Sequence, residues 1–330
     1  MSKAMDISVV ICTYNRSETL KLTLESFLRM EWDNQTKHEL IVVDNNSTDD
    51  TKQVIMGYIK NNFDTLKYVM ETMTGLSYAR NKGIEEANGK IVAFADDDVD
   101  FDRRWGQEIV DAFQANPDAG CLGGKNIPFF IEGKPEWIPE ELYYIYGDVG
   151  FGDEVKILKF PEHPYGLNMA FKKEVFEKVG LFNPELGRKK LSLLSGEESE
   201  LFYRVNQLGM KTIYTPFAVV KHLIPPNRTG KEWILKRVYW GGISEVVFEQ
   251  LISTKSKKLI LKEMIQDIGA LKKGILGNYF SPKKIYWHIK RLRFEQWAHY
   301  CYKLGIIRQK CLEIFTIRVQ KNCSNINAGN

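Results

Sequence analysis

The sequence predicts an α/β fold, in which a Rossmann-like, mostly parallel sheet is flanked by helices and followed by a C-terminal helical extension. Short apolar runs at residues 7–12, 39–43 and 91–95 are typical of strands that are covered on both faces. Stretches with apolar residues at helical spacing lie between these runs, and polar clusters follow the runs directly. Strands that alternate with helices in this way favour parallel pairing in a doubly wound sheet.

The elements follow in order along the chain. In the first hundred residues we expect strands over residues 7–12, 39–43, 66–70 and 91–95, separated by helices that carry Leu20 and Leu24, Val54 and Ile59, and Ile84 and Ala87. In the next part we expect helices over residues 105–113 and 173–179 and one that begins after Gly196, with strands over residues 119–123 and 166–171. Two edge strands, over residues 212–214 and 218–220, would be separated by Pro216.

Three adjacent aspartates, Asp96, Asp97 and Asp98, follow the apolar run of residues 91–95. Neighbouring carboxylates repel one another, so a cation at this strand end would offset their charge. In extended backbone, Asp96 and Asp98 would face one site while Asp97 turns away. Carboxylate oxygens favour Mg²⁺ or Mn²⁺, which leave coordination positions for phosphate oxygens. A solvated acidic turn is the alternative for an isolated triplet.

Two further polar clusters, at residues 13–16 and 44–49, also follow predicted strands. In open α/β sheets, ligands bind beyond the carboxyl ends of the strands, so we expect the three clusters to share one crevice. The chain has no GxGxxG after its first strand and no GxxxxGK[ST] segment. A bound diphosphate would therefore be held by the metal.

Four segments are distinctive: VVICTYNR, VVDNNSTDD, GLSYARNKGIEEANGKIVAFADDDV and GEESELFYR. In this order and spacing they resemble glycosyltransferase family 2, the nucleotide-sugar-dependent enzymes with the GT-A fold. The resemblance covers roughly residues 5–226. It implies a nucleoside-diphosphate sugar as donor, with UDP-sugar as the first expectation, and a hydroxyl of a glycan, polysaccharide or lipid-linked molecule as acceptor.

The resemblance also assigns side chains to the donor. Asp44 would accept a hydrogen bond from the base, Tyr14 would lie against it, and Arg80 would reach it from the following turn. Each residue taken alone also has a structural alternative: Asp44 could form a turn, Tyr14 could be a loop aromatic packed on the sheet, and Arg80 could be a charge on a helix surface. The full set expected to bind the nucleotide sugar is Thr13, Tyr14, Asn15, Asp44, Arg80, Asp96, Asp97 and Arg228.

Glu197 and Glu198 begin the helix that follows Gly196, where acidic side chains also suit the helix dipole. In the family this turn carries the catalytic base, usually as Glu-Asp, so the second position departs from the pattern by one methylene. We expect Glu198 to be the base, with Glu197 as the second choice. It would take the proton of the acceptor hydroxyl in a single displacement that inverts the anomeric carbon.

Three more residues complete the predicted site. The resemblance implies that His222 joins Asp96 and Asp98 as a metal ligand, and imidazole suits Mn²⁺ better than Mg²⁺. It also implies that Asn168 bonds to a sugar hydroxyl. Arg228 could bind the diphosphate, because a guanidinium matches phosphate geometry, or it could be a solvated loop cation. Residues 128–161, rich in aromatic side chains, either pack over the sheet or give a platform for a sugar.

Composition is that of an ordinary globular protein, with 330 residues, 44% hydrophobic and 27% charged. No run of about 18 apolar residues occurs, so we expect a cytoplasmic protein without a membrane span. Its five cysteines have no CxxC spacing and indicate neither disulfides nor zinc. We divide the chain into a catalytic domain, residues 1–226, and a helical extension, residues 227–330.

The extension becomes basic from residue 281. Ten Lys or Arg and two Glu give residues 281–330 a net charge of +8, against +4 for the whole chain. Aromatic side chains are interleaved with these cations, which is typical of an amphipathic helix on an anionic membrane surface, here the inner face. A helical bundle packed on the catalytic domain and a homo-oligomer contact are the alternatives. We expect no nucleic acid, because no recognised binding module accompanies the charge.

Other functions remain open at this point. A nucleotidyltransferase would normally bring a glycine-rich loop after the first strand. A catalytically silent scaffold that binds nucleotide sugars or glycans would be indicated by loss of Asp98 or of both Glu197 and Glu198, and all three are present. A glycoside hydrolase with paired carboxylates would not explain the clusters at residues 13–16 and 44–49. The sequence therefore favours a metal-assisted glycosyltransferase.

Overall fold

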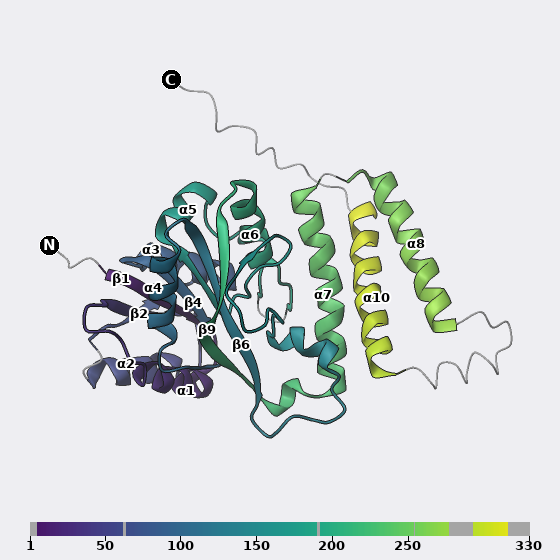
Figure 1. Cartoon of the computed structure of the whole chain (residues 1–330). Coiled ribbons are helices and arrows are strands. Elements are labelled where there is room, and N and C mark those ends of the chain that lie inside the picture. Colours follow the sequence, from purple (N-terminus) through teal and green to yellow (C-terminus); the bar gives the residue numbers. More distant parts are fainter. Residues whose placement is uncertain (1–4, 62–63, 190–191, 254, 277–292, 316–330) are drawn as a thin grey trace.

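The structure is a computed structural model that describes residues 5–61, 64–189, 192–253, 255–276 and 293–315. A mixed sheet with helices on both faces is followed by long C-terminal helices (Figure 1). The strands are β1 (Met5–Thr13), β2 (His38–Asp44), β3 (Leu66–Met70), β4 (Gly89–Asp96), β5 (Val99–Phe101), β6 (Ala119–Phe130), β7 (Lys156–Leu158), β8 (Asn168–Lys172) and β9 (Lys211–Ile224). The helices are α1 (Ser17–Leu28), α2 (Thr51–Lys60), α3 (Leu76–Glu86), α4 (Trp105–Ala115), η1 (Glu140–Tyr146), α5 (Lys173–Val179), α6 (Glu197–Gln207), η2 (Pro226–Arg228), α7 (Lys231–Ile252), α8 (Lys257–Leu276) and α10 (Phe294–Phe315).

The sheet has the strand order β3-β2-β1-β4-β8-β6-β9-β5, and β7 pairs with β9. The first four strands are parallel, whereas β8 runs antiparallel to both β4 and β6. In register, Thr13 lies beside Asp44 and Cys12 lies beside Asp96. The predicted α/β architecture is confirmed, and the carboxyl ends of β1, β2 and β4 meet at one edge.

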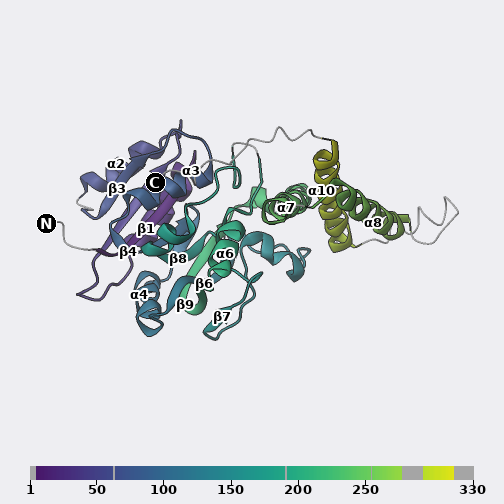
Figure 2. The same ribbon diagram turned by 90° about the horizontal axis from the view of Figure 1, so that it is seen from above.

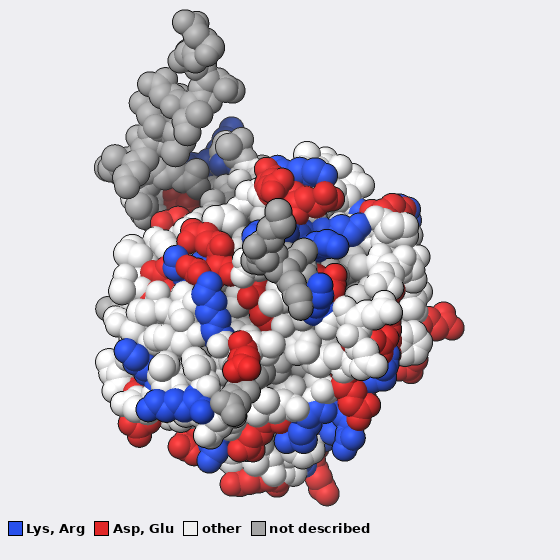
Figure 3. Space-filling view, turned by 90° about the vertical axis from the view of Figure 1, so that its left-hand side faces the viewer, with Lys and Arg blue, Asp and Glu red and all other residues white. Residues whose placement is uncertain are grey.

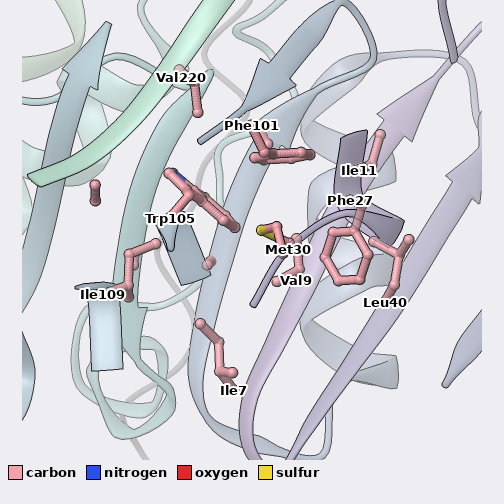
Figure 4. Close-up of a cluster of buried hydrophobic side chains, with 14 of the residues drawn as sticks. Ile7, Val9, Ile11, Phe27, Met30, Leu40, Phe101, Trp105, Ile109 and Val220 are labelled. Carbon is pink, nitrogen blue, oxygen red and sulfur yellow. The ribbon is translucent and has the colours of Figure 1, made fainter. Parts of the chain in front are cut away.

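Alternation along β1 explains why helices cover both faces of the sheet. Ile7, Val9 and Ile11 point into a core shared with α1, α2 and α4 (Figure 4). Val10 points to the opposite face, where it packs with residues of α3, α5 and α6. Each fully buried aliphatic side chain contributes about 1.5–3 kcal/mol. The apolar runs therefore fix the strands between two helical layers and hold their polar ends in place.

Two predicted strand boundaries are wrong. Residues 212–214 and 218–220 belong to one strand, β9, which is paired on both sides and is no edge. The pairing between β6 and β9 shifts register between Gly123 and Lys125, opposite Tyr214 and Val219, so Pro216 lies in a bulge that tolerates its missing N–H. Strand β6 likewise continues past residue 123 to Phe130.

The C-terminal helices lie side by side, with α10 between α7 and α8 (Figures 1 and 2). A Cβ atom at Gly242 of α7 or at Gly305 of α10 would overlap the backbone of the other helix, so the two glycines allow close approach. Lys310 of α10 forms ion pairs with Glu263 and Asp267 of α8, at 3.3 and 2.8 Å. For α10 the structure shows the helical bundle that was one of the alternatives to membrane binding.

The extension also packs on the sheet-containing part. Ile234 and Val238 of α7 share a core with residues of η1 and with Ala298 of α10. Tyr146 is fully buried and stacks on Trp233, with ring centroids 5.8 Å apart. No helix in the described ranges is long and apolar enough to cross a membrane. Six of the ten basic residues predicted to contact lipid lie outside the described residues: Lys283, Lys284, Lys290, Arg291, Arg318 and Lys321.

Candidate active site

A cavity of about 820 Å³ opens at the carboxyl ends of β1 and β4 and reaches the C-terminal helices. Its lining brings together residues that are far apart in the sequence. The sheet edge supplies Thr13, Tyr14, Arg16, Asp96, Asp97 and Asp98; α6 supplies Glu197 and Glu198; β9 and η2 supply His222 and Arg228; and α7 and α10 supply Trp233, Arg237, Phe248 and Tyr302. Most of the predicted site residues therefore border one space.

The predicted extended backbone through the three aspartates is wrong. Strand β4 ends at Asp96, and Asp97 and Asp98 form a turn before β5. Asp97 accepts hydrogen bonds from Thr13 Oγ1 at 2.7 Å and from Arg16 Nη1 at 2.9 Å. Asp98 Oδ2 accepts from Arg16 Nη1 at 2.5 Å. The turn thus directs Asp97 and Asp98 toward the loop that follows β1.

His222 lies next to this turn because it pairs with Val99 across β5 and β9. Its Nδ1 is 2.6 Å from the carbonyl oxygen of Tyr146, which can only accept, so Nδ1 carries a proton. Its Nε2 then faces Asp98 Oδ1 at 3.4 Å, and Asp98 Oδ1 is buried without a hydrogen-bond partner. Although burial opposes it, the charge of Asp98 raises the pKa of His222.

This pair fits a divalent cation. A histidine that binds a metal through one nitrogen usually donates the other N–H to a carbonyl or carboxylate, as His222 does to Tyr146. Within the described ranges, however, no group of three or more His, Cys, Asp and Glu side chains lies close enough to hold a metal. Of the predicted ligands Asp96, Asp98 and His222, the last two are in contact, so they would hold a cation and leave its other positions to donor oxygens and water.

Arg80 links the aspartates to α6. It is buried, donates through Nη1 to Glu197 Oε1 at 2.9 Å, and has Nη2 3.8 Å from Asp96. Burial and the charge of Glu198 raise the pKa of Glu197 to about 8. Burial raises the pKa of Glu198, but the charge of Arg80 acts in the opposite direction, and the net shift is downward. Glu198 is then the ionised member of the pair, and the buried Oε2 atoms of both Glu197 and Glu198 have no hydrogen-bond partner.

Two residues predicted to bind the nucleoside have mainly local contacts. Asp44 accepts from the backbone N–H of Ser47 at 2.8 Å and from the hydroxyl of Tyr68 at 3.1 Å. Asn15 accepts from the backbone N–H of Thr48 at 2.7 Å, which ties the two loops together. Neither borders the cavity, whereas the half-exposed Tyr14 does.

Asn168 makes its hydrogen bonds inside the protein. Its buried amide accepts from Trp105 Nε1 at 2.9 Å and donates to the carbonyl oxygens of Lys125 and Ala218, at 3.2 and 2.9 Å. Every strong contact of the amide is therefore made inside the protein, and Asn168 does not line the cavity. In this structure Asn168 cross-links β8, β6 and β9, and its bond to a sugar hydroxyl stays a prediction.

Several residues of the cavity were not predicted. Arg16 was visible as part of a polar loop, but not as the partner of two aspartates. His163 accepts from Ser199 Oγ at 2.9 Å, beside Glu198, and only the fold brings it there. Among the aromatic residues of segment 128–161, Tyr144 and Phe160 border the cavity, while Tyr146 is packed inside. Arg228, by contrast, was predicted; it borders the cavity and has Nη1 3.1 Å from Asp98 Oδ2.

Comparison with known proteins gives consistent results. A family model described as glycosyl transferase family 2 matches residues 8–180. Glucosyl-dolichyl phosphate glucuronosyltransferase of Haloferax volcanii is 34% identical over 269 residues, which cover 79% of this chain and 83% of that protein. Succinoglycan biosynthesis protein ExoM of Rhizobium meliloti is 23% identical over 242 residues, 73% of this chain and 74% of that protein.

One solved structure shows the same fold. Mannosyltransferase PcManGT from Pyrobaculum calidifontis, in complex with GDP-Man and Mn²⁺, aligns with a TM-score of 0.63 at 18% identity. The alignment covers 94% of this chain and 88% of that chain, so it includes C-terminal helices as well as the sheet. The predicted GT-A arrangement is thereby confirmed.

Proposed function

Because the chain belongs to glycosyltransferase family 2, we propose that it is an inverting enzyme that moves a sugar from a nucleoside-diphosphate donor to a hydroxyl of a lipid-linked glycan. One observation carries this proposal. The buried, unpartnered Oε2 of Glu198 lies in the same cavity as the Asp98–His222 pair. One cavity would thus hold both a base for the acceptor hydroxyl and a cation next to the donor diphosphate.

In the proposed reaction, the acceptor oxygen forms a bond to the anomeric carbon while the bond from that carbon to the diphosphate breaks. The electron pair of the broken bond stays on the diphosphate, and the acceptor proton passes to Glu198. Arg228, which contacts Asp98, would bind a phosphate of the donor through paired hydrogen bonds. Mn²⁺ or Mg²⁺, when bound, would offset the charge that develops on the diphosphate. A UDP-sugar is the first donor to test.

A membrane-bound acceptor is supported by the outer face of α8. Leu261, Ile265 and Ile268 are exposed by 41%, 60% and 44%, and their spacing puts them on one stripe of the helix. Exposed Lys258, Lys262 and Lys272 lie on the same side, whereas Glu263 and Asp267 face α10. An apolar stripe flanked by lysines suits an anionic lipid surface. We therefore include peripheral membrane binding, through α8, in the proposal.

Substitution of Glu198 by Gln tests the proposed base. The amide keeps the size of the side chain but cannot take a proton, so turnover should fall by about 100-fold or more while nucleotide binding is retained. Calorimetric titration of UDP and assay of sugar transfer measure the two effects. Glu200→Gln is the matched control, because Glu200 lies on the same helix and pairs with Arg204 instead of bordering the cavity. Near-normal turnover of Glu198→Gln would remove Glu198 from this role.

A further inference from the structure

Five arginines line the active-site cavity, and two of them have no acidic partner in the described part of the chain. Arg16 and Arg228 form ion pairs with Asp98, and Arg80 forms one with Glu197. The other two are Arg188 and Arg237, for which no ion pair is present among the described residues. The cavity therefore holds two guanidinium groups whose charge is not offset by a contacting carboxylate.

Arg237 lies on α7 and turns into the cavity beside the proposed base. Its Nη1 reaches Ser195 Oγ only at 3.5 Å, and its Nε is buried without a hydrogen-bond partner. Burial and the charge of Arg188 lower the pKa of Arg237 to about 10, while the charge of Glu198 acts in the opposite direction. A buried donor without a partner is costly, so a ligand atom that satisfies it would be bound favourably.

Arg188 is held near this position by its backbone. Its carbonyl oxygen accepts from the N–H of Leu76, at the start of α3, at 3.0 Å. Arg188 lines the same cavity as Asp96 and Arg237, and its charge acts on the pKa values of both. Two cations that face the same space repel one another unless an anion lies between them.

We propose that Arg188 and Arg237 form an oxyanion subsite, which binds a carboxylate of the transferred sugar or a phosphate of the lipid-linked acceptor. The inference rests on the proposed glycosyl transfer and names the substrate class of the same cavity. In the proposed reaction the diphosphate would bind Arg228 beside Asp98. Arg237 lines the same cavity as the proposed base Glu198 and has Nη1 3.5 Å from Oγ of Ser195, three residues before it, so Arg237 would face the sugar and the acceptor. Guanidinium groups bind carboxylates and phosphates with paired hydrogen bonds.

The donor side is tested by titrating UDP, UDP-glucose and UDP-glucuronate into the full chain with Mn²⁺. GDP, GDP-mannose and GDP-mannuronate replace them if the protein binds GDP instead. The two sugars of each pair differ only at the carboxylate. If the subsite binds a carboxylate of the donor sugar, the wild type should bind the uronate nucleotide at least tenfold more tightly than the neutral sugar nucleotide. Arg237→Met should reduce this ratio of affinities by tenfold or more. Lys236→Met, an exposed change one residue away, should keep it.

The acceptor side is tested with octyl glucoside and glucosyl octyl phosphate as acceptors. If the phosphate is the bound group, Arg237→Met should raise the KM of the phosphorylated acceptor at least tenfold more than that of the neutral one. Arg188→Met should also weaken the preference for the charged ligand, in whichever of the two experiments Arg237→Met has an effect. Arg237→Lys keeps the positive charge and should therefore retain part of that preference. Melting temperatures show that each variant is folded.

Two results would overturn the subsite. In the first, neither the wild type nor Arg237→Met distinguishes the charged member of a pair from the neutral one, either in donor affinity or in the KM of the acceptor. In the second, free nucleoside diphosphate loses as much affinity as the sugar nucleotides, which would place Arg237 at the diphosphate. If the wild type binds neither UDP nor GDP, the proposed function fails as a whole, and this outcome is distinct from the other two.

Discussion

At the scale of single residues, the cavity is defined by buried charges that lack full compensation. Asp98 contacts Arg16, Arg228 and His222, yet its Oδ1 has no hydrogen bond. Glu197 and Glu198 are adjacent carboxyl groups, and the charge of Arg80 opposes a rise in the pKa of either one. Buried groups of this kind are costly for folding and are typical of functional sites.

Glu197 gives a prediction for the pH dependence of stability. Its pKa is raised from 4.5 to about 8 by burial and by Glu198, so the folded protein binds a proton there that the unfolded chain releases between these values. This contribution is fully present below pH 4.5 and is lost as the pH rises through about 8. A pKa raised by one unit corresponds to about 1.4 kcal/mol.

Chemical unfolding at pH 5 and at pH 8.5 measures this effect. The unfolding free energy of the wild type should fall more between the two pH values than that of Glu197→Gln. The exposed Glu154→Gln is the control and should follow the wild type. Equal pH dependence in all three proteins would show that Glu197 is not protonated in the folded state.

At the scale of secondary-structure elements, close contacts between segments position the arginines and carboxylates. Gly166, before β8, is an example, because a Cβ atom there would overlap Nη2 of Arg80. Arg80 cannot move freely, since it is buried and bonded to Glu197. The loop before β8 therefore presses on α3 and fixes the guanidinium between β4 and α6.

Gly166→Ala should destabilise the protein by about 1–3 kcal/mol, because an added methyl group in a filled space forces a shift. Thermal unfolding measures the loss, and sugar transfer should fall with it as Arg80 is displaced from Glu197. Gly57→Ala is the matched control: it lies inside α2 with nothing within 4 Å of the new Cβ. Its melting temperature should stay the same or rise, since Ala is the better helix former. A melting temperature of Gly166→Ala equal to that of the wild type would contradict this account.

The sequence predicts the first four strands and their helices well, because their apolar patterns are local. It does not predict the length of β9, since the continuation of this strand across the bulge at Pro216 depends on pairing with β5, β6 and β7. The clusters at Thr13 and Asp98 were placed at one edge from parallel pairing alone. Arg237 could not be placed in that way, because a cation on a C-terminal helix looks like a surface charge until packing against the sheet is known.

At the scale of the whole molecule, the cavity lies between the sheet and the C-terminal helices, so both parts of the chain contribute to it. Basic and acidic side chains are interspersed on the face of the molecule shown in Figure 3. That face has no large area of only positive or only negative charge. The outer side of α8 differs from it, with lysines around an exposed apolar stripe.

Replacing Leu261, Ile265 and Ile268 together by Ser tests membrane binding through α8. Loss of this apolar area should weaken binding to vesicles roughly tenfold. Sedimentation of the full chain with phosphatidylcholine vesicles, with and without phosphatidylserine, measures it. Leu22→Ser with Leu28→Ser is the control, because both leucines are 48% exposed on α1, away from α8. Unchanged sedimentation of the triple variant, or sedimentation that is independent of phosphatidylserine, would rule out this surface.

The most direct test of the central claim is calorimetric titration of UDP and GDP into wild type and Asp98→Asn, with and without Mn²⁺. We predict that one of these nucleotides binds the wild type, that Mn²⁺ strengthens its binding at least tenfold, and that Asp98→Asn loses this strengthening, because Asp98 and His222 would hold the cation. Asp100→Asn, at the neighbouring strand β5, should behave as the wild type. Failure of both nucleotides to bind, or an effect of Mn²⁺ that persists unchanged in Asp98→Asn, would contradict the account.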